Sequence, residues 1–188
     1  MKSKQISKIT FLLQIVSVLL CITCLLSGCS GGISIDSLKD KINDNYGGFI
    51  GIGELEIKKN NEGYGFNYLQ AHVGWTSTYW GQADDAKNVK SVNIMIIKTN
   101  GTFDFSSVDS IEKACEKGDN NDLPTNYFVK SVSVLYKVLG GFNTVNSYSS
   151  NKEVEKDIVN NASKTMNGWS FRIETNDKNA TVKAKYKG

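Results

Sequence analysis

The sequence predicts a single α+β domain in which a mostly antiparallel sheet packs against three or four helices. Apolar residues alternate with polar ones, as in half-buried strands, both before and after a central block with helical periodicity. Strands followed by helices and then by strands favour this class over alternating parallel units. Without an N-terminal segment of 28 residues, the remaining 160 residues are enough for one domain with its own core.

The elements of the first half follow from residue spacing. Ile35–Asn45 is predicted to be a helix, because apolar residues recur on one face and Ser34 can cap it. Phe49–Lys58 and Tyr64–Trp75 are predicted strands joined by an Asn-Asn-Glu-Gly turn. Ser91–Thr99 is the strongest strand, and because both of its faces are apolar we expect it at the centre of the sheet.

The pair Asn100-Gly101 predicts a hairpin from that strand into Thr102–Phe105. Val108–Lys117 and Tyr127–Leu139 are predicted helices, each followed by glycine. The second helix has an apolar stripe of Phe128, Val132, Leu135 and Leu139. Ser150–Glu153 matches a capping box and predicts a third helix that ends at Gly168.

The chain then closes with a predicted hairpin. Trp169, Phe171 and Ile173 alternate in its first strand, and Val182 and Ala184 alternate in the returning strand.

The N-terminal segment has the parts of an export signal. Lys2, Lys4 and Lys8 make a positive start, and an apolar stretch follows from Thr10 to Leu26. This stretch is short for a helix that spans a bilayer, which needs about 20 apolar residues. Leu26-Ser27-Gly28-Cys29 closes the segment with small residues before a cysteine.

This tetrapeptide resembles the lipobox of bacterial lipoproteins. The resemblance implies cleavage before Cys29 and a diacylglycerol on its thiol, so residues 1–28 would be a signal peptide and residues 29–34 a lipidated cysteine and tether. Two acyl chains hold a protein on a membrane far better than one. Residues 35–188 would then sit close to the outer surface of the cell membrane, because five tether residues reach at most roughly 17 Å.

The counts of charged residues and cysteines bear on the partners, the disulfides and the source of this protein. The lysines of the signal account for the net charge of +3, and the remainder carries 19 basic and 19 acidic residues, so nucleic acid is not an expected partner. Cys115 is the only thiol left after cleavage and lipidation, so we expect no internal disulfide. One arginine against 21 lysines indicates an AT-rich genome and, with the lipobox, a Gram-positive bacterium.

No residue pattern predicts catalysis, a cofactor or a metal. His72 is the only histidine, and no Gly-x-Ser-x-Gly elbow accompanies it. Cys115 lies on the apolar stripe of its helix and is predicted to be an inert core residue. Asp84 and Asp85 could act as an acid/base pair, although adjacent carboxylates in a loop are commonly only solvated. Gly51-Ile52-Gly53 lacks the rest of a phosphate loop, and its glycines are expected to leave room for an aromatic ring.

The segment from Trp75 to Trp80 concentrates three large rings and three hydroxyls. Such rings suit stacking on a sugar or gripping a peptide, whereas the alternative is that they fill the core. If Trp75, Tyr79 and Trp80 form a binding face, at least two of the rings should be open to solvent on one side.

These observations favour a non-catalytic lipoprotein of the cell surface, anchored to the membrane at Cys29, that binds an envelope component or a partner protein. Its ligand would be a glycan, a peptide or a protein. Two alternatives are a cell-wall hydrolase that uses Asp84, Asp85 or His72, and an inhibitor or immunity-type lipoprotein.

Overall fold

The computed structural model of the chain describes residues 32–46, 51–116, 122–142 and 152–188. The export signal, Cys29 and the first part of the predicted capping box lie outside the described residues. Residues 33–188 form one compact unit with its own hydrophobic core. Within the described residues, no helix is long and apolar enough to cross a membrane.

The architecture is α+β, as predicted: one open sheet with helices on one of its faces. All seven strands pair antiparallel with their neighbours, in the order β1-β2-β3-β4-β7-β6-β5. The strands are β1 (Glu56–Asn60), β2 (Gly63–His72), β3 (Trp75–Ala83), β4 (Val89–Lys98), β5 (Ser163–Met166), β6 (Trp169–Thr175) and β7 (Asn179–Tyr186). The helices are α2 (Ile35–Tyr46), α3 (Val108–Glu116), α4 (Leu123–Gly140) and α5 (Lys152–Val159).

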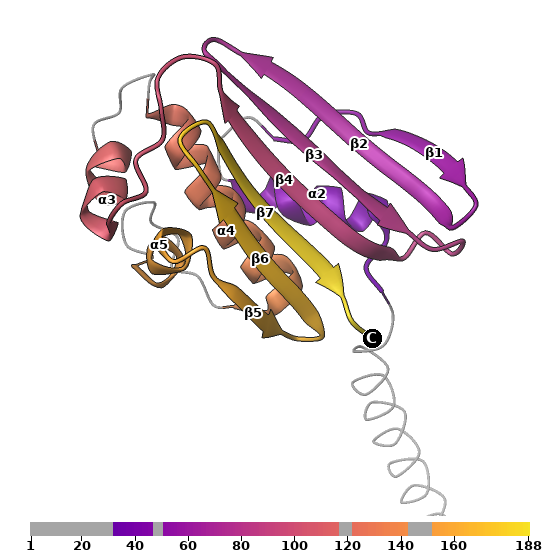
Figure 1. The fold of residues 1–188 in the computed structure, drawn as a ribbon. Helices are drawn as coiled ribbons and strands as arrows, with labels where there is room; N and C mark the ends of the chain where they lie inside the picture. The colour runs from indigo at the N-terminus through magenta and orange to yellow at the C-terminus, as the bar shows by residue number, and fades with distance from the viewer. Residues whose placement is uncertain (1–31, 47–50, 117–121, 143–151) are drawn as a thin grey trace, which may run out of the picture. The chain divides into compact units, whose positions relative to one another are not determined.

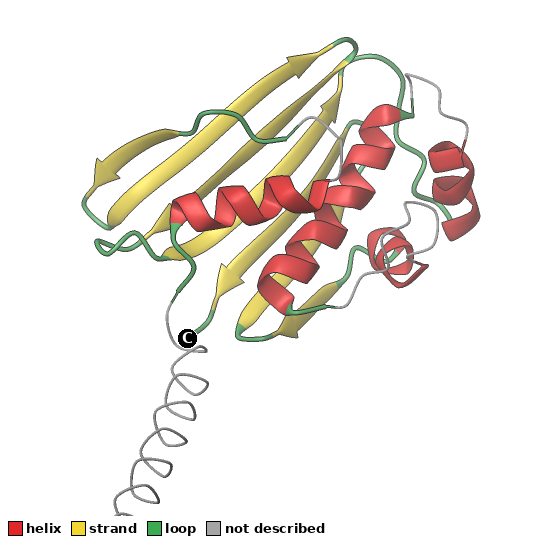
Figure 2. Ribbon diagram, turned by 180° about the vertical axis from the view of Figure 1, so that it is seen from behind, coloured by secondary structure: helices red, strands yellow, loops and turns green. Residues whose placement is uncertain are grey.

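The first four strands form a meander, and the chain then leaves the sheet for three helices before it returns. The last strand in the sequence, β7, lies beside β4, and β4 is the central strand of the sheet (Figure 1). Helices α2 and α4 lie behind the sheet in Figure 1 and in front of it in Figure 2, and α3 and α5 lie beside it, so none of the described helices covers the other face. The core therefore sits between one face of the sheet and α2 and α4.

Helix α4 is the centre of that core. The predicted stripe of Phe128, Val132, Leu135 and Leu139 is buried. Most of the rest of the helix is buried as well, because the sheet lies on one side and other helices lie on the other. Helix α2 also begins as predicted, since the Ser34 hydroxyl accepts a hydrogen bond from the backbone N–H of Ser37 (3.2 Å).

The predicted strand over Phe49–Lys58 is wrong in its first part, because the described residues before Glu56 are not in a strand. The side chain of Asn43 takes the place of a neighbouring strand: its amide donates to the carbonyl of Ile52 (2.9 Å), and its oxygen accepts from the Ile52 N–H (2.7 Å). At Gly53, a Cβ atom would lie 2.8 Å from the ring of Tyr68, so this glycine does leave room for an aromatic ring.

The predicted Asn100-Gly101 hairpin is also wrong. Residues 102–105 form no strand, because β3 and β7 already occupy both edges of β4. Instead the rings of Phe103 and Phe105 stack, with centroids 4.9 Å apart, and Phe105 packs against Phe128 of α4. The segment fills one end of the core rather than extending the sheet.

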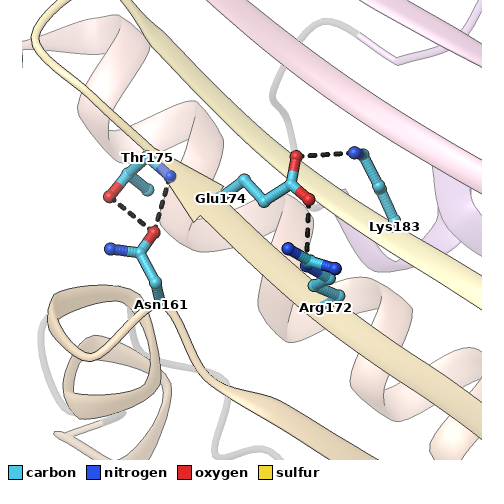
Figure 3. A network of polar contacts seen from close by, with 5 residues as sticks. All are labelled: Asn161, Arg172, Glu174, Thr175 and Lys183. Carbon is cyan, nitrogen blue, oxygen red and sulfur yellow. Dashed lines mark hydrogen bonds and ion pairs between the residues drawn. The ribbon is translucent and has the colours of Figure 1, made fainter.

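The third predicted helix is shorter than expected. It ends at Val159, and Ala162 and Met166 lie beyond it, Met166 in strand β5. Asn161 adopts a left-handed backbone (φ 47°), and its side-chain oxygen accepts hydrogen bonds from the N–H (2.6 Å) and the hydroxyl of Thr175 (Figure 3). Asn167 and Gly168, also left-handed, then make the tight turn between β5 and β6, so Gly168 is a hairpin glycine and not a helix stop.

Candidate binding face

The structure separates the three aromatic residues that the sequence singles out. Trp75, Tyr79 and Trp80 all lie on β3, but alternation along the strand sends the first two toward the helices. Trp75 is 5% exposed and Tyr79 is 3% exposed, whereas Trp80 is half-buried on the opposite face. A binding face with at least two of these rings open to solvent on one side is therefore not formed, because the strand continues without the bend that it would require.

On the helix side, the rings belong to a buried aromatic cluster. The imidazole of His72 stacks on the indole of Trp75, with centroids 3.6 Å apart, and the ring of Tyr127 lies 5.2 Å from that indole. The Tyr79 hydroxyl is buried and has no hydrogen-bond partner in the part of the chain that the structure describes. Burial raises the pKa of Tyr79, so the phenol stays protonated. This cluster fills the core.

His72 does not lie near Asp84 and Asp85, the carboxylates that a hydrolase could use with it. His72 ends β2, whereas Asp84 follows the strand residue that pairs with Tyr64 at the other end of β2. Eight residues of extended strand place the two side chains roughly 25 Å apart. His72 Nε2 instead lies 3.2 Å from the hydroxyl of Ser77, and its burial lowers the pKa of the imidazole.

Asp84 and Asp85 lie in the turn between β3 and β4. The Asp84 carboxylate accepts a hydrogen bond from the backbone N–H of Asn88 (2.8 Å), which holds its pKa below the usual range, and it also pairs with Lys90. Asp85 is exposed and lies 3.8 Å from Lys59. Among the described residues, no group of three or more histidine, cysteine or acidic side chains could hold a metal.

A buried carboxylate that the sequence analysis did not single out lies between α3 and α5. Glu155 is 0% exposed, and neither of its oxygens has a hydrogen-bond partner among the described residues. Burial, with the nearby Glu112, raises its pKa. Cys115 lies close by, and burial raises the pKa of its thiol to about 12. An acidic group and a protonated thiol, without a base beside them, do not make a nucleophile.

The uncovered face of the sheet offers a different arrangement. Five side chains of this face stand in register on five consecutive strands and form what we call the transverse row: Asn67 (β2), Trp80 (β3), Asn93 (β4), Lys183 (β7) and Arg172 (β6). Each residue pairs directly with the next across the sheet, so neighbouring side chains are about 5 Å apart. The row thus places two amides, one indole and two cations along one line.

Apolar and hydroxyl side chains flank the transverse row on one side. Leu69, Thr78, Met95 and Thr181 form the next register line, and Leu69 is 66% exposed. On the other side, Lys185 pairs with Ser91 of β4 and with Ser170 of β6. An antiparallel sheet commonly leaves one face to solvent, but a large ring and exposed leucine on that face favour a contact surface.

The cations of the row are tied together by one carboxylate. Figure 3 shows Glu174 between Arg172 and Lys183: one of its oxygens forms an ion pair with Arg172 Nε (2.9 Å) and the other pairs with the Lys183 ammonium. These partners lower the pKa of Glu174, so it is ionised at neutral pH. Arg172 approaches Glu174 with its Nε, and 69% of the Arg172 side chain stays exposed.

Sequence reasoning identified only Trp80 among the residues of this row. The alternation of polar residues in each strand was visible, but the row depends on register between strands that are far apart in sequence, such as β4 and β7. No family model matches the chain, and no curated protein or solved structure proved similar to it. The class of protein is therefore defined by the fold and by this face: an α+β domain with a single uncovered, mixed polar and aromatic sheet surface.

Proposed function

We propose that the protein is a non-catalytic lipoprotein of the bacterial cell surface, and that its domain binds an envelope component or a partner protein through the uncovered face of the sheet. The observation that carries this proposal is the transverse row, which exposes an indole between two amides and ends in cations. Tryptophan and arginine are the side chains that most often dominate binding surfaces.

The anchor rests on the lipobox Leu26-Ser27-Gly28-Cys29. The carbonyl of Ile33 accepts a hydrogen bond from Val89 N–H at the start of β4, so a tether from Cys29 would enter the domain at that end of the sheet.

A hydrolase is the less favoured function. It has less support, because His72 and Asp84 lie at opposite ends of β2 and because Asp84 is bound to Asn88 and Lys90. An inhibitor or immunity-type lipoprotein remains a form of the same proposal, because it would bind a protein through the same face.

One experiment in the native host tests both the lipid anchor and the binding face. Cells carry the full chain with a photoreactive amino acid at Leu69, on the uncovered face, or at Lys41, which is exposed on α2. A palmitate analogue should label the protein but not its Cys29→Ala variant. After illumination, crosslinked products should appear from position 69 and not from position 41. Undiminished lipid label in Cys29→Ala would contradict the anchor, and equal crosslinking at both positions would contradict the binding face.

A further inference from the structure

We infer that the transverse row binds an acidic glycan, with a sugar ring on Trp80 and the acidic group of the same chain at Arg172 and the lysines beside it. This inference rests on the proposed function and names the chemistry of its ligand. The acidic group is a carboxylate or a phosphate, since both suit a guanidinium.

The length of the row favours an extended chain molecule. From Asn67 on β2 to Arg172 on β6 the row crosses four strand spacings, or about 19 Å. A ligand that contacts both ends must therefore be several rings long. Because the face is an open sheet and not a closed pocket, the ligand can extend past the transverse row at both edges of the sheet.

The middle of the row offers what a neutral sugar ring needs. Trp80 supplies a flat apolar surface, and Asn67 and Asn93 stand on either side of it. Asn93 donates one N–H to the carbonyl of Trp80 (3.4 Å), and Asn67 donates to Glu56 (3.2 Å). Each amide keeps its oxygen for a ligand hydroxyl, so a ring that stacks on the indole could be held at both sides.

The β7–β6 end of the row offers charge. Arg172, Lys183 and Lys185 lie on this face against a single carboxylate, Glu174, which leaves two positive charges in excess. Lys185 is exposed, and within the described residues no ion pair or hydrogen bond holds it. Glu174 pairs with Arg172 at Nε, and 69% of the Arg172 side chain is exposed, so the guanidinium is accessible to an anion that it could bind in a bidentate manner.

The order of these groups separates a glycan from other polyanions. A nucleic acid carries a phosphate at every unit, but the row has its cations at one end only. An acidic peptide would use the cations without requiring the indole between two amides. The row therefore matches a ligand in which rings with hydroxyls and acidic groups occur together.

The test uses the soluble domain, residues 30–188, because residues 33–188 contain the whole core. Calorimetry would measure its binding to a hexuronic-acid oligosaccharide, to the same oligosaccharide with its carboxyls reduced, to a poly(glycerol phosphate) oligomer and to a polyglutamate peptide. We expect binding to the acidic oligosaccharide that weakens as salt rises to about 0.5 M. The reduced oligosaccharide lacks the acidic groups and the peptide lacks the sugar rings. Each should therefore bind at least about tenfold more weakly.

Variants connect that binding to the row. Trp80→Leu keeps the apolar character and removes the flat ring, and Arg172→Gln removes the guanidinium; each should weaken binding by roughly tenfold or more. Lys41→Gln removes one positive charge from exposed α2 and should change nothing, and melting curves confirm that each variant is folded. The glycerol phosphate oligomer has no sugar ring and should also bind more weakly, so binding as tight as that of the uronic acid would contradict the place of a sugar ring on Trp80.

Two results would overturn the inference. If polyglutamate binds as tightly as the acidic oligosaccharide, or if Trp80→Leu binds normally, the face is only a general cation exchanger. If no acidic glycan binds while Leu69 still crosslinks to a protein in cells, the glycan ligand is refuted and the proposed function survives with a protein partner. Loss of both signals would refute the binding face itself.

Discussion

The ring of His72 lies parallel to the indole of Trp75, with the centroids 3.6 Å apart and the planes within 8° of each other. The two residues pair directly at the turn between β2 and β3. This stack brings the only histidine of the chain to the edge of the core, where partial burial lowers the pKa of the imidazole.

The lowered pKa of His72 predicts a loss of stability in mild acid. Below an unfolded-state pKa of about 6.5, the unfolded chain takes up a proton that the folded domain resists. The free energy of unfolding should therefore fall as the pH drops from about 7 toward the folded-state pKa. His72→Phe keeps a ring on Trp75 and should flatten this dependence in urea titrations between these pH values. A dependence as steep in His72→Phe as in the parent would contradict the assignment.

Truncation of the three β3 aromatics should have unequal effects. Trp75→Ala and Tyr79→Ala remove buried rings and should each lower the free energy of unfolding by about 3–5 kcal/mol. Trp80→Ala removes a half-buried ring from the uncovered face and should cost less than about 1.5 kcal/mol. Thermal and urea unfolding of the soluble domain measure all three. An equally large loss at Trp80 would mean that this ring serves the fold and not a ligand.

The unpartnered hydroxyl of Tyr79 gives a separate prediction. A buried O–H without an acceptor costs stability, so Tyr79→Phe should leave the domain as stable as before or raise the free energy of unfolding by up to about 1 kcal/mol. Tyr46→Phe is the matched control, because the Tyr46 hydroxyl forms a 2.9 Å hydrogen bond with Ser131 and its removal should destabilise. A loss at Tyr79→Phe as large as the loss at Tyr46→Phe would show that the hydroxyl has a partner.

The buried Glu155 predicts the opposite pH dependence from His72. Its raised pKa means that the folded domain holds a proton that the unfolded chain releases, so stability from this group is lost as the pH rises above about 4.5. Glu155→Gln should raise the free energy of unfolding by about 1 kcal/mol at neutral pH and make little difference near pH 4. Glu116→Gln, on exposed α3, is the control. A destabilised Glu155→Gln domain at neutral pH would show that the carboxylate is paired when folded.

The fold was predictable where a pattern depends on neighbours in sequence. The stripe of α4 and the two apolar faces of β4 both follow from local spacing, and both are confirmed. The failures come from contacts across the fold. Asn43 replaces a strand partner at Ile52, and β7 takes the edge of β4 that the Asn100-Gly101 hairpin would have used.

The candidate face also combines a feature that local sequence indicates with features that depend on contacts across the fold. Trp80 was visible as an aromatic residue, but the choice between core and surface depends on strand register, which one residue can reverse. The register sends Trp75 and Tyr79 inward and places Trp80 beside Asn93 and Asn67. The link from Trp80 to Arg172 passes from Asn93 of β4 to Lys183 of β7, which are 90 residues apart in sequence, and no local pattern indicates it.

The last prediction concerns Cys115, which is the only cysteine in a soluble domain of residues 30–188. Burial, together with the charges of Glu155, Asp122 and Glu116, raises the pKa of its thiol to about 12, so almost none of it is thiolate at pH 8. A thiol reagent should therefore react with the native domain at least about a hundredfold more slowly than with the domain unfolded in urea. The double variant Cys115→Ser with Lys113→Cys moves the thiol to an exposed position of the same helix and should react quickly in both states. Fast reaction of Cys115 in the native domain would show that α3 opens readily or that the thiol is activated, and either result would contradict an inert core role for this residue.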